Sequence, residues 1–261
     1  MRNEANGRFE RRTALITGGA RGIGYAAATE IVRGGGRVAL ADIDGNAASA
    51  SAAALENAIG LACDVRDGDS VARMVERAEG EFGKIDLFIN SAAVLDDKRF
   101  LESSPEDWRR MMSVCLDGPM IWLRAILPGM VERGYGRVVC LASDSARVGQ
   151  ARLSYYAAAK AGVIALVKSV AQEVGRNGVT LNVVSPGATN TPMRMDREKI
   201  MREKMGEEKY ARREKAVLKM YPTGRIGEPE DAAAAIAFLC SDQASWITGQ
   251  VVSVNGGFVM P

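Results

Sequence analysis

The sequence predicts an α/β protein built on a doubly wound parallel sheet of about seven strands, with helices on both faces. Short apolar runs of β-strand character alternate with longer runs of helical periodicity, and a glycine-rich turn follows the first apolar run. The 261 residues are 47% hydrophobic and 25% charged, which is typical of a soluble protein with a full core. No internal repeat or linker interrupts the pattern, so residues 1–261 are expected to form one domain.

The expected strands and helices alternate along the whole chain. In order, the strands are Thr13–Thr17, Arg37–Ala41, Gly60–Asp64, Leu87–Asn90, Arg137–Ala142, Thr180–Ser185 and Val251–Val254. The helices lie near Gly22–Arg33, Ala47–Asn57, Asp69–Phe82, Pro105–Arg133, Ser154–Arg176 and Glu228–Leu239. Ser104 before Pro105, and Glu228 before Pro229, are typical helix starts. Such alternation implies right-handed crossovers between parallel strands.

Composition and charge exclude several classes of function. The formal net charge of +2 lacks the basic excess of a nucleic-acid-binding protein. The absence of histidine removes the commonest general base, the commonest metal ligand and every Ser-His-Asp triad. Cys63, Cys115, Cys140 and Cys240 are far apart and form no Cys-x-x-Cys pair, so neither a metal site nor a disulfide framework is expected.

The N-terminal segment and the hydropathy pattern give no targeting signal. Residues 1–12 are polar and lack the apolar region of a signal peptide. No uninterrupted apolar run reaches the roughly 18 residues that span a bilayer. We therefore expect a cytoplasmic protein with no membrane partner.

A glycine-rich turn follows the first predicted strand and opens a helix. It reads Thr17-Gly18-Gly19-Ala20-Arg21-Gly22-Ile23-Gly24. Glycines let the backbone turn tightly and approach a pyrophosphate, which then binds amides at the positive end of the helix. A turn of this kind within a strand–helix–strand unit is typical of a Rossmann-like dinucleotide site. We expect cofactor contacts from Gly18, Arg21, Gly22, Ile23 and Gly24.

The end of the second strand indicates which dinucleotide binds. Asp42 lies eighteen residues after Gly24, where a carboxylate accepts hydrogen bonds from the adenosine ribose hydroxyls and repels a 2′-phosphate. Arg21 argues mildly the other way, because a guanidinium in the glycine-rich turn could meet a 2′-phosphate. The sequence favours NAD over NADP.

Tyr156 and Lys160 form a candidate proton-transfer pair. Four residues apart on a predicted helix, they share one face. A nearby ammonium favours the phenolate and is expected to lower the pKa of Tyr156 from its ordinary value of about 10. Tyr155 is set aside, because it lies five residues from Lys160 and so points about 140° around the helix from it.

These motifs together resemble the classical short-chain dehydrogenase/reductase family over nearly the whole chain. Ser143, thirteen residues before Tyr156, has the spacing of that family's catalytic serine. Further similar stretches are Cys63-Asp64-Val65, Asn90-Ser91-Ala92-Ala93, Pro186–Thr191, Gly224-Arg225 and Asn255-Gly256-Gly257. The resemblance implies catalysis by Ser143, Tyr156 and Lys160. It also implies cofactor contacts from Tyr156, Lys160, Asp64, Val65, Asn90, Pro186, Gly187, Thr189 and Thr191.

Two positions depart from the family pattern. Cys115 stands where the family has a catalytic asparagine, whose amide helps hold a water that links the lysine to solvent. A thiol is a weak donor and acceptor, so the proton route is expected to differ, although Cys115 as a small buried hydrophobic residue is the simpler interpretation. Ala93 replaces the glycine that usually closes the turn after the fourth strand.

The resemblance implies hydride transfer between a nicotinamide and a carbinol carbon, with Tyr156 exchanging the hydroxyl proton. Ser143 would hold the substrate oxygen, and Lys160 would hydrogen-bond the nicotinamide ribose. The family usually assembles as tetramers or dimers, so a homotetramer or homodimer is expected.

The substrate is less well defined. Residues 192–221 correspond to the family's substrate lid, and Met193–Tyr221 is rich in methionine and charge. Its methionines could form an adaptable apolar wall, and its cations could meet a carboxylate or the phosphates of a coenzyme A thioester. On this segment alone, a solvated amphipathic helix is an equal interpretation.

Three functions remain open at this stage. The stretch around residues 127–149 is similar to 2-hydroxycyclohexanecarboxyl-CoA dehydrogenases, which favours a ring-bearing secondary alcohol, free or as a thioester. The second candidate is a 3-oxoacyl-thioester reductase of fatty-acid or polyketide type. The third is a dinucleotide-binding sensor or scaffold without redox activity.

Overall fold

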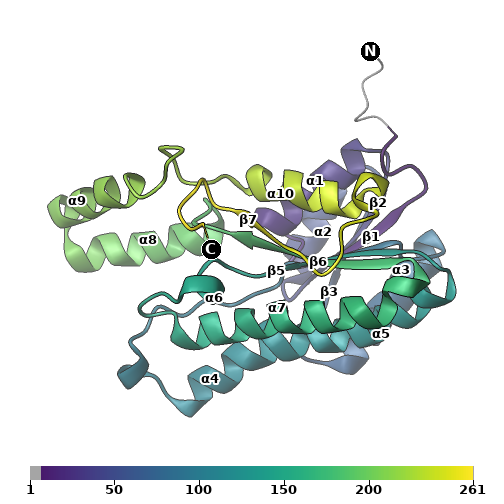
Figure 1. Ribbon diagram of the computed structural model, residues 1–261, viewed down its shortest axis with the longest axis horizontal. Helices are drawn as coiled ribbons and strands as arrows, with labels where there is room; N and C mark the ends of the chain where they lie inside the picture. The colour runs from purple at the N-terminus through teal and green to yellow at the C-terminus, as the bar shows by residue number, and fades with distance from the viewer. Residues whose placement is uncertain (1–6, 261) are drawn as a thin grey trace.

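The computed structural model describes residues 7–260. Residues 1–6 and 261, at the two ends of the predicted domain, lie outside the described residues. Seven parallel strands form one sheet in the order β3-β2-β1-β4-β5-β6-β7. Helices cover both faces: α1, α2 and α10 lie on one side, and α3, α5 and α7 lie on the other (Figure 1). The structure confirms the predicted fold class.

The element bounds agree closely with the predicted order. The strands are β1 (Thr13–Thr17), β2 (Arg37–Asp42), β3 (Ala58–Ala62), β4 (Leu87–Asn90), β5 (Gly136–Leu141), β6 (Val179–Pro186) and β7 (Val251–Val254). The helices are α1 (Gly22–Arg33), α2 (Gly45–Ala53), α3 (Gly68–Phe82), α4 (Pro105–Met112), α5 (Gly118–Glu132), α6 (Ser145–Val148), α7 (Ser154–Val174), α8 (Pro192–Met205), α9 (Glu207–Leu218) and α10 (Pro229–Cys240).

The predicted bounds of α2 and β3 were wrong by two or more residues. The Asp44 side chain caps α2 by accepting a hydrogen bond from the amide of Ala47, so the helix begins earlier than predicted. It also ends earlier, and the chain turns at Asn57, whose φ is 52°. Gly60 lies inside β3. The residue there must be glycine, because a Cβ would lie only 2.1 Å from the backbone oxygen of Ala48. The glycine marks close packing of α2 on the strand, not the start of the strand.

The single long helix predicted over Pro105–Arg133 is interrupted. A π-helical turn at Ser113–Asp117 separates α4 from α5. Pro119 explains the interruption, because it has no amide hydrogen to donate to the carbonyl of Cys115 four residues earlier, and its ring would crowd that carbonyl. By length and composition alone, the stretch Pro105–Glu132 could cross a membrane, although core helices of soluble proteins pass the same test. Buried side chains of α5, Trp122 among them, pack into the core of this protein.

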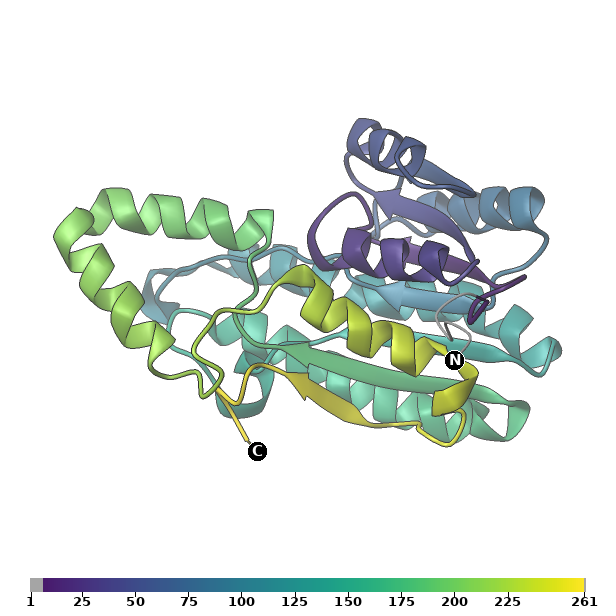
Figure 2. The same cartoon turned by 90° about the horizontal axis from the view of Figure 1, so that it is seen from above.

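The predicted lid segment forms two helices that project from the rest of the molecule. α8 and α9 meet at Gly206, whose φ of 78° breaks the helix. Figure 2 shows them as a green hairpin extending away from the sheet. Their few buried side chains include Glu198 and Tyr210, which hydrogen-bond each other.

Because the strands are parallel, their carboxyl ends all lie at the same end of the sheet, where a crevice forms between β1 and β4. The chain winds in one direction through β1, β2 and β3 and in the other through β4 to β7, so the order reverses between β1 and β4. Thr17 pairs with Asn90 at the carboxyl ends of these two strands. A crevice at this reversal is where ligands bind in open α/β sheets.

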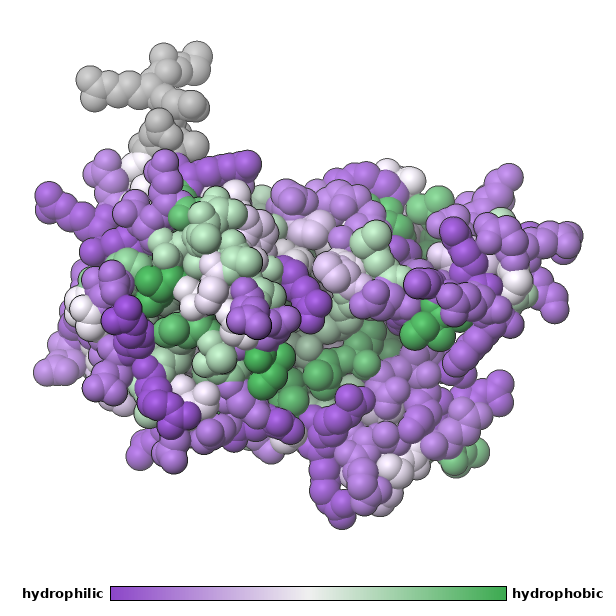
Figure 3. Space-filling view, turned by 180° about the vertical axis from the view of Figure 1, so that it is seen from behind, coloured by the Kyte–Doolittle hydropathy of each residue, from purple (hydrophilic) through white to green (hydrophobic). Residues whose placement is uncertain are grey.

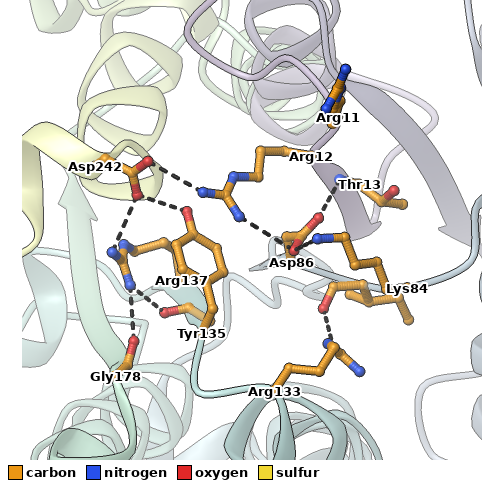
Figure 4. A network of polar contacts seen from close by, with 12 residues as sticks. Arg11, Arg12, Thr13, Lys84, Asp86, Arg133, Tyr135, Arg137, Gly178 and Asp242 are labelled. Atoms are coloured by element: carbon orange, nitrogen blue, oxygen red, sulfur yellow. Dashed lines mark hydrogen bonds and ion pairs between the residues drawn. The ribbon is translucent and has the colours of Figure 1, made fainter.

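A network of polar contacts connects the strands at their amino ends, opposite the crevice (Figure 4). Asp86, 1% exposed, accepts a hydrogen bond from the amide of Thr13 at 3.1 Å. The same carboxylate lies 2.9 Å from the ammonium of Lys84 and 3.6 Å from the guanidinium of Arg12. Asp86 therefore ties the start of β1 to the start of β4.

Asp242 makes a second, exposed connection in this network. It accepts hydrogen bonds from the Tyr135 hydroxyl at 2.9 Å and from Arg137 and Arg12 at 3.3 Å each. The guanidinium of Arg137 also donates to the carbonyl of Gly178. Asp242 thus joins the end of α10 to β5 and to the turn before β6.

Asp86→Asn should lower the free energy of unfolding by about 2 kcal/mol, because it keeps the shape but removes the charge that faces two cations. Asp242→Asn is the matched control. It should cost less than about 1 kcal/mol, because that carboxylate is exposed. Urea denaturation of both variants measures the difference, and equal losses would contradict the role given to the burial of Asp86.

Candidate active site

A cavity of about 980 Å³ opens at the carboxyl edge of the sheet. It is lined by residues that follow β1, β2, β3, β4, β5 and β6, and by residues of the α8–α9 lid. Figure 3 shows hydrophobic surface between the projecting lid, at upper right, and the lobe below it. Most of the predicted site residues lie around this cavity. Gly18, Arg21, Gly22, Ile23, Asp42, Asp64, Val65, Ser143, Tyr156, Lys160, Pro186, Gly187, Thr189 and Thr191 all line it.

The glycine-rich turn forms a cradle that side chains would fill. A Cβ at Gly18 would lie 2.8 Å from the Cα of Ala92, on the turn after β4. Gly18 and Gly22 both have a φ of 60°, which favours glycine. α1 begins at Gly22, so its first amides point toward the cavity as an anion site. These features fit the pyrophosphate of a dinucleotide.

Gly24 and Asn90 do not line the cavity, but both make contacts that hold the glycine-rich turn beside it. A Cβ at Gly24 would lie 2.3 Å from the carbonyl oxygen of Gly18, so only glycine lets α1 pack under the turn. The Asn90 side chain is buried and accepts a hydrogen bond from the hydroxyl of Thr17 at 3.1 Å. Within residues 7–260, its amide nitrogen has no hydrogen-bond partner, so it keeps a donor beside the crevice.

Asp42 is fixed at the end of β2, with 8% of its surface exposed. Its carboxylate accepts hydrogen bonds from the amides of Ala20 and Asp44, at 3.2 Å each. The carboxylate therefore holds the glycine-rich turn and presents negative charge to the cavity. A carboxylate at the end of the second strand is where the adenosine ribose of a dinucleotide binds in folds of this kind.

Asp64 carries a partner that the sequence motif did not reveal. Two nitrogens of the Arg66 guanidinium bind its carboxylate, the shorter contact being 2.7 Å. These hydrogen bonds hold the pKa of Asp64 below its ordinary value. Arg66 also lines the cavity, so it is a further candidate for contact with the adenine end of the cofactor. Its only sequence signal was adjacency to the Asp64-Val65 pair.

Lys160 is 1% exposed, and its ammonium donates a hydrogen bond to the carbonyl of Leu141 at 2.8 Å. Burial lowers the pKa of Lys160, because removing an ammonium from water disfavours its charge. The ammonium lies 5.9 Å from the centre of the Tyr156 ring. α7 thus brings the predicted pair to the end of β5, on one side of the cavity.

The sequence predicted that Lys160 lowers the pKa of Tyr156, but in the folded protein this pKa is raised. Burial of the Tyr156 phenol raises its pKa, and hydrogen bonding with Ser143 lowers it by less. The nearby Cys115 thiol also raises the pKa of Tyr156, so the lowering expected from Lys160 is not what the folded protein produces. Tyr156 is therefore protonated at neutral pH and ready to act as an acid.

Ser143 is oriented by a second serine. The hydroxyl of Ser145 donates to the Ser143 oxygen at 2.9 Å, and the amide of Ser145 donates to it at 3.3 Å. Both contacts use Ser143 as acceptor, so its own hydroxyl proton can be donated toward the cavity, where the Tyr156 phenol is its partner in this structure. Ser145, which is buried, was missed at the sequence level although it lies only two residues away.

Tyr155 on α7 and Cys115 on the π-helical turn belong to one small apolar cluster, against which Tyr156 also packs. The hydroxyl of Tyr155 donates to Asp96 at 2.6 Å. Cys115 is 0% exposed and does not line the cavity. Its thiol faces the carbonyl of Val94 at 3.6 Å and the sulfur of Met111 at 3.7 Å. These surroundings favour the interpretation of Cys115 as a small buried hydrophobic residue.

The substrate end of the cavity carries both apolar and charged side chains. The apolar ones are Val94, Leu95, Val148, Leu153, Met193, Val217, Met220, Tyr221, Phe258 and Val259. Charged side chains of α4 and the lid line the same cavity, namely Arg110, Arg194, Asp196, Arg197, Glu198 and Arg213. Phe258 and Val259 were not predicted, because the last motif recognised in the sequence ends at Gly257. Phe258 follows that motif and stacks on Tyr221 with ring centres 5.0 Å apart. The chain end thus closes the wall that the lid begins.

Such a cleft, with a dinucleotide cradle at one end and a tyrosine acid beside a buried lysine at the other, belongs to a nicotinamide-dependent oxidoreductase of alcohols and ketones. A family model described as enoyl-(acyl carrier protein) reductase matches residues 18–259. The 3-oxoacyl-(acyl-carrier-protein) reductase of Vibrio harveyi is 36% identical over 253 residues, which cover 97% of this chain and 99% of that protein.

Two further comparisons agree. The acetoacetyl-CoA reductase of Rhizobium meliloti is 36% identical over 248 residues, which cover 94% of this chain and 98% of that protein. The crystal structure of levodione reductase matches with a TM-score of 0.89 at 34% identity, covering 96% of this chain and 98% of the other. The chain belongs to the short-chain dehydrogenase/reductase family.

When bound, the nicotinamide supplies or accepts the hydride. Ser143 and Tyr156 both line the cavity, where the family resemblance leads us to expect that Ser143 holds the substrate oxygen and Tyr156 gives it a proton. In the reverse direction, the Tyr156 phenolate would remove the same proton. The Lys160 ammonium fixes α7 to β5 and supplies positive charge that favours the phenolate when it forms.

Tyr156→Phe should lower turnover by about two to four decades, because the proton donor is lost. The affinity for the cofactor should change little, since only the hydroxyl is removed. Tyr155→Phe is the matched control and should keep most of the activity. Steady-state rates and fluorescence titration with NADH measure the two effects, and a Tyr156→Phe enzyme that kept most of its activity would contradict the assignment.

Proposed function

We propose that this protein is an NAD-dependent dehydrogenase and ketoreductase for a secondary alcohol with a compact, ring-bearing apolar body, free or as a thioester. The observation that carries this proposal is the apolar wall facing Ser143 and Tyr156, formed by the lid and the chain end. The cofactor contacts and catalytic roles given above for the predicted residues are part of the proposal.

The charges around the substrate end support an apolar substrate body. Of the lid cations that line the cavity, Arg197 lies 2.5 Å from the carboxylate of Asp97. Arg213 and Arg194 face Glu198, at 2.7 and 3.7 Å. Because these acids compensate part of the positive charge of the arginines, the lid offers less attraction to an anion than its composition predicts.

We assign Arg110, which lies outside the lid, as the cationic contact for a thioester arm. Arg110 on α4 lines the cavity, and its guanidinium lies 3.9 Å from Asp96, a looser pairing than those within the lid. The relatives that act on thioesters support the second candidate, a 3-oxoacyl-thioester ketoreductase. A redox-inactive scaffold is disfavoured, because Ser143, Tyr156 and Lys160 meet at one cavity.

The proposal for NAD rests on the Asp42 carboxylate, fixed inside the cavity by two backbone amides. Catabolic oxidation usually draws on NAD, which suits an alcohol dehydrogenase. A cytoplasmic location and a homotetramer or homodimer complete the proposal and follow the family expectation.

The substrate proposal is tested by the formation of NADH from a panel of alcohols. Cyclohexanol, 2-hydroxycyclohexanecarboxyl-CoA and 3-hydroxybutyryl-CoA are compared at equal concentration. The proposed function predicts the highest kcat/KM for a ring-bearing alcohol. Preference for 3-hydroxybutyryl-CoA would favour the second candidate, and NAD binding without turnover of any compound would favour the scaffold.

Asp42→Ala should weaken NADH binding about tenfold or more, because hydrogen bonds to a charged group are lost. The same change should narrow the difference in affinity between NADH and NADPH, since the repulsion of the 2′-phosphate is removed. Fluorescence titration with both cofactors measures it. A wild-type protein that bound NADPH as tightly as NADH would contradict the role of Asp42.

A further inference from the structure

Asp97, in the segment after β4, contacts two arginines from two different parts of the chain. Its carboxylate accepts a hydrogen bond from Arg197 on α8 at 2.5 Å. The other carboxylate oxygen accepts a hydrogen bond from Arg152, in the loop before α7. Arg152 also donates to the backbone carbonyl of Asp97 at 2.9 Å. One acidic residue therefore joins the β4–α4 segment, the lid and the approach to α7.

The backbone at Arg152 shows that this junction holds a strained conformation. Arg152 has a φ of 71°, a left-handed conformation that is strained for a residue with a side chain. Its carbonyl accepts a hydrogen bond from the amide of Lys98 at 3.2 Å. The contacts with Asp97 and Lys98 hold this turn two residues before α7, the helix that carries Tyr156.

The contact with Arg197 anchors an element that has little other support. α8 and α9 project from the body and pack on each other (Figures 1 and 2). The buried centre of this hairpin is the Glu198 carboxylate, with Tyr210 and Arg213 bound to it, instead of an apolar core. A hairpin of this kind gains little from apolar burial, so its position depends on contacts such as Asp97–Arg197.

Asp97 itself does not line the cavity, whereas Arg197 does. Burial acts to raise the pKa of Asp97, but the hydrogen bonds from Arg152 and Arg197 outweigh it and hold this pKa below its ordinary value. The carboxylate therefore stays ionised, and both contacts persist, across the neutral range.

We propose that Asp97 is a positioning residue, which fixes α8 and the turn before α7 relative to each other and so sets the shape of the substrate end. The proposal rests on the proposed function in one respect, that the substrate end receives the alcohol or ketone. It predicts that Asp97 governs the KM for that substrate and leaves the affinity for the cofactor unchanged, because the cradle for the pyrophosphate lies elsewhere.

The test compares Asp97→Asn and Arg197→Gln with Lys199→Gln. Each change removes one charge, and Lys199 is an exposed cation on the same helix, so it is the matched control. In both test variants, amide hydrogen exchange across α8 should become about tenfold faster, and the KM for the best ketone of the panel should rise about tenfold. The kcat and the affinity for NADH should change less than twofold.

The double variant Asp97→Asn with Arg197→Gln should behave like Asp97→Asn alone, because both changes break the same contact. Unchanged exchange across α8 in both single variants would overturn the proposal, and so would equal effects in Lys199→Gln. Weakened NADH binding in the test variants would also overturn it, by showing a general loss of structure.

Hydrogen exchange needs no substrate, so it decides the positioning role even if the proposed function fails. That failure would appear separately, as a wild-type protein with no turnover on any compound of the panel.

Discussion

The buried ammonium of Lys160 is the constraint on which the arrangement of the catalytic end depends. A charge withdrawn from water is tolerated only where polar groups replace the lost solvation. Here the carbonyl of Leu141, at the end of β5, supplies that contact. Helix α7 must therefore stand at a fixed height on the sheet, and Tyr156, one helical turn earlier, is placed at the cavity as a consequence.

Packing along α7 reinforces this placement. The part of α7 that follows Lys160 packs against the sheet through the buried side chains of Val163, Val167 and Ala171. A Cβ at Gly162 would lie 2.9 Å from the side chain of Leu116, so α7 approaches the π-helical turn closely at that residue. The interruption caused by Pro119 and the position of the catalytic helix are thus parts of one packing arrangement.

The sequence predicted most of the fold because its signals are local. Strand–helix alternation and the glycine-rich turn after Thr17 define a doubly wound sheet without tertiary information. The break at Ser113–Asp117 was also present in the sequence, as Pro119, but the apolar pattern on both sides concealed it. The start of β3 was predicted two residues too late, because Gly60 was taken to mark where the strand begins. Glycine is needed there because α2 packs closely on the strand.

The site was predictable where spacing along one element determines it, as for Tyr156 and Lys160. It was not predictable where the outcome depends on burial or on distant partners. The raised pKa of Tyr156 follows from the partial removal of a half-buried phenol from water, which no spacing reveals. The partial charge compensation of the lid arginines depends on Asp97 and Glu198, and the pairing of Asp97 with Arg197 joins residues one hundred positions apart.

We expect that burial, more than the charge of Lys160, decides the protonation of Tyr156 in the free protein. Carbon-13 NMR of protein labelled at the tyrosine Cζ measures it directly, with the Tyr156 signal assigned by its absence in Tyr156→Phe. We predict that this signal remains that of a phenol above the ordinary tyrosine pKa of about 10. A Tyr156 signal that became phenolate below about pH 9 would contradict the account, because Lys160 would then outweigh burial.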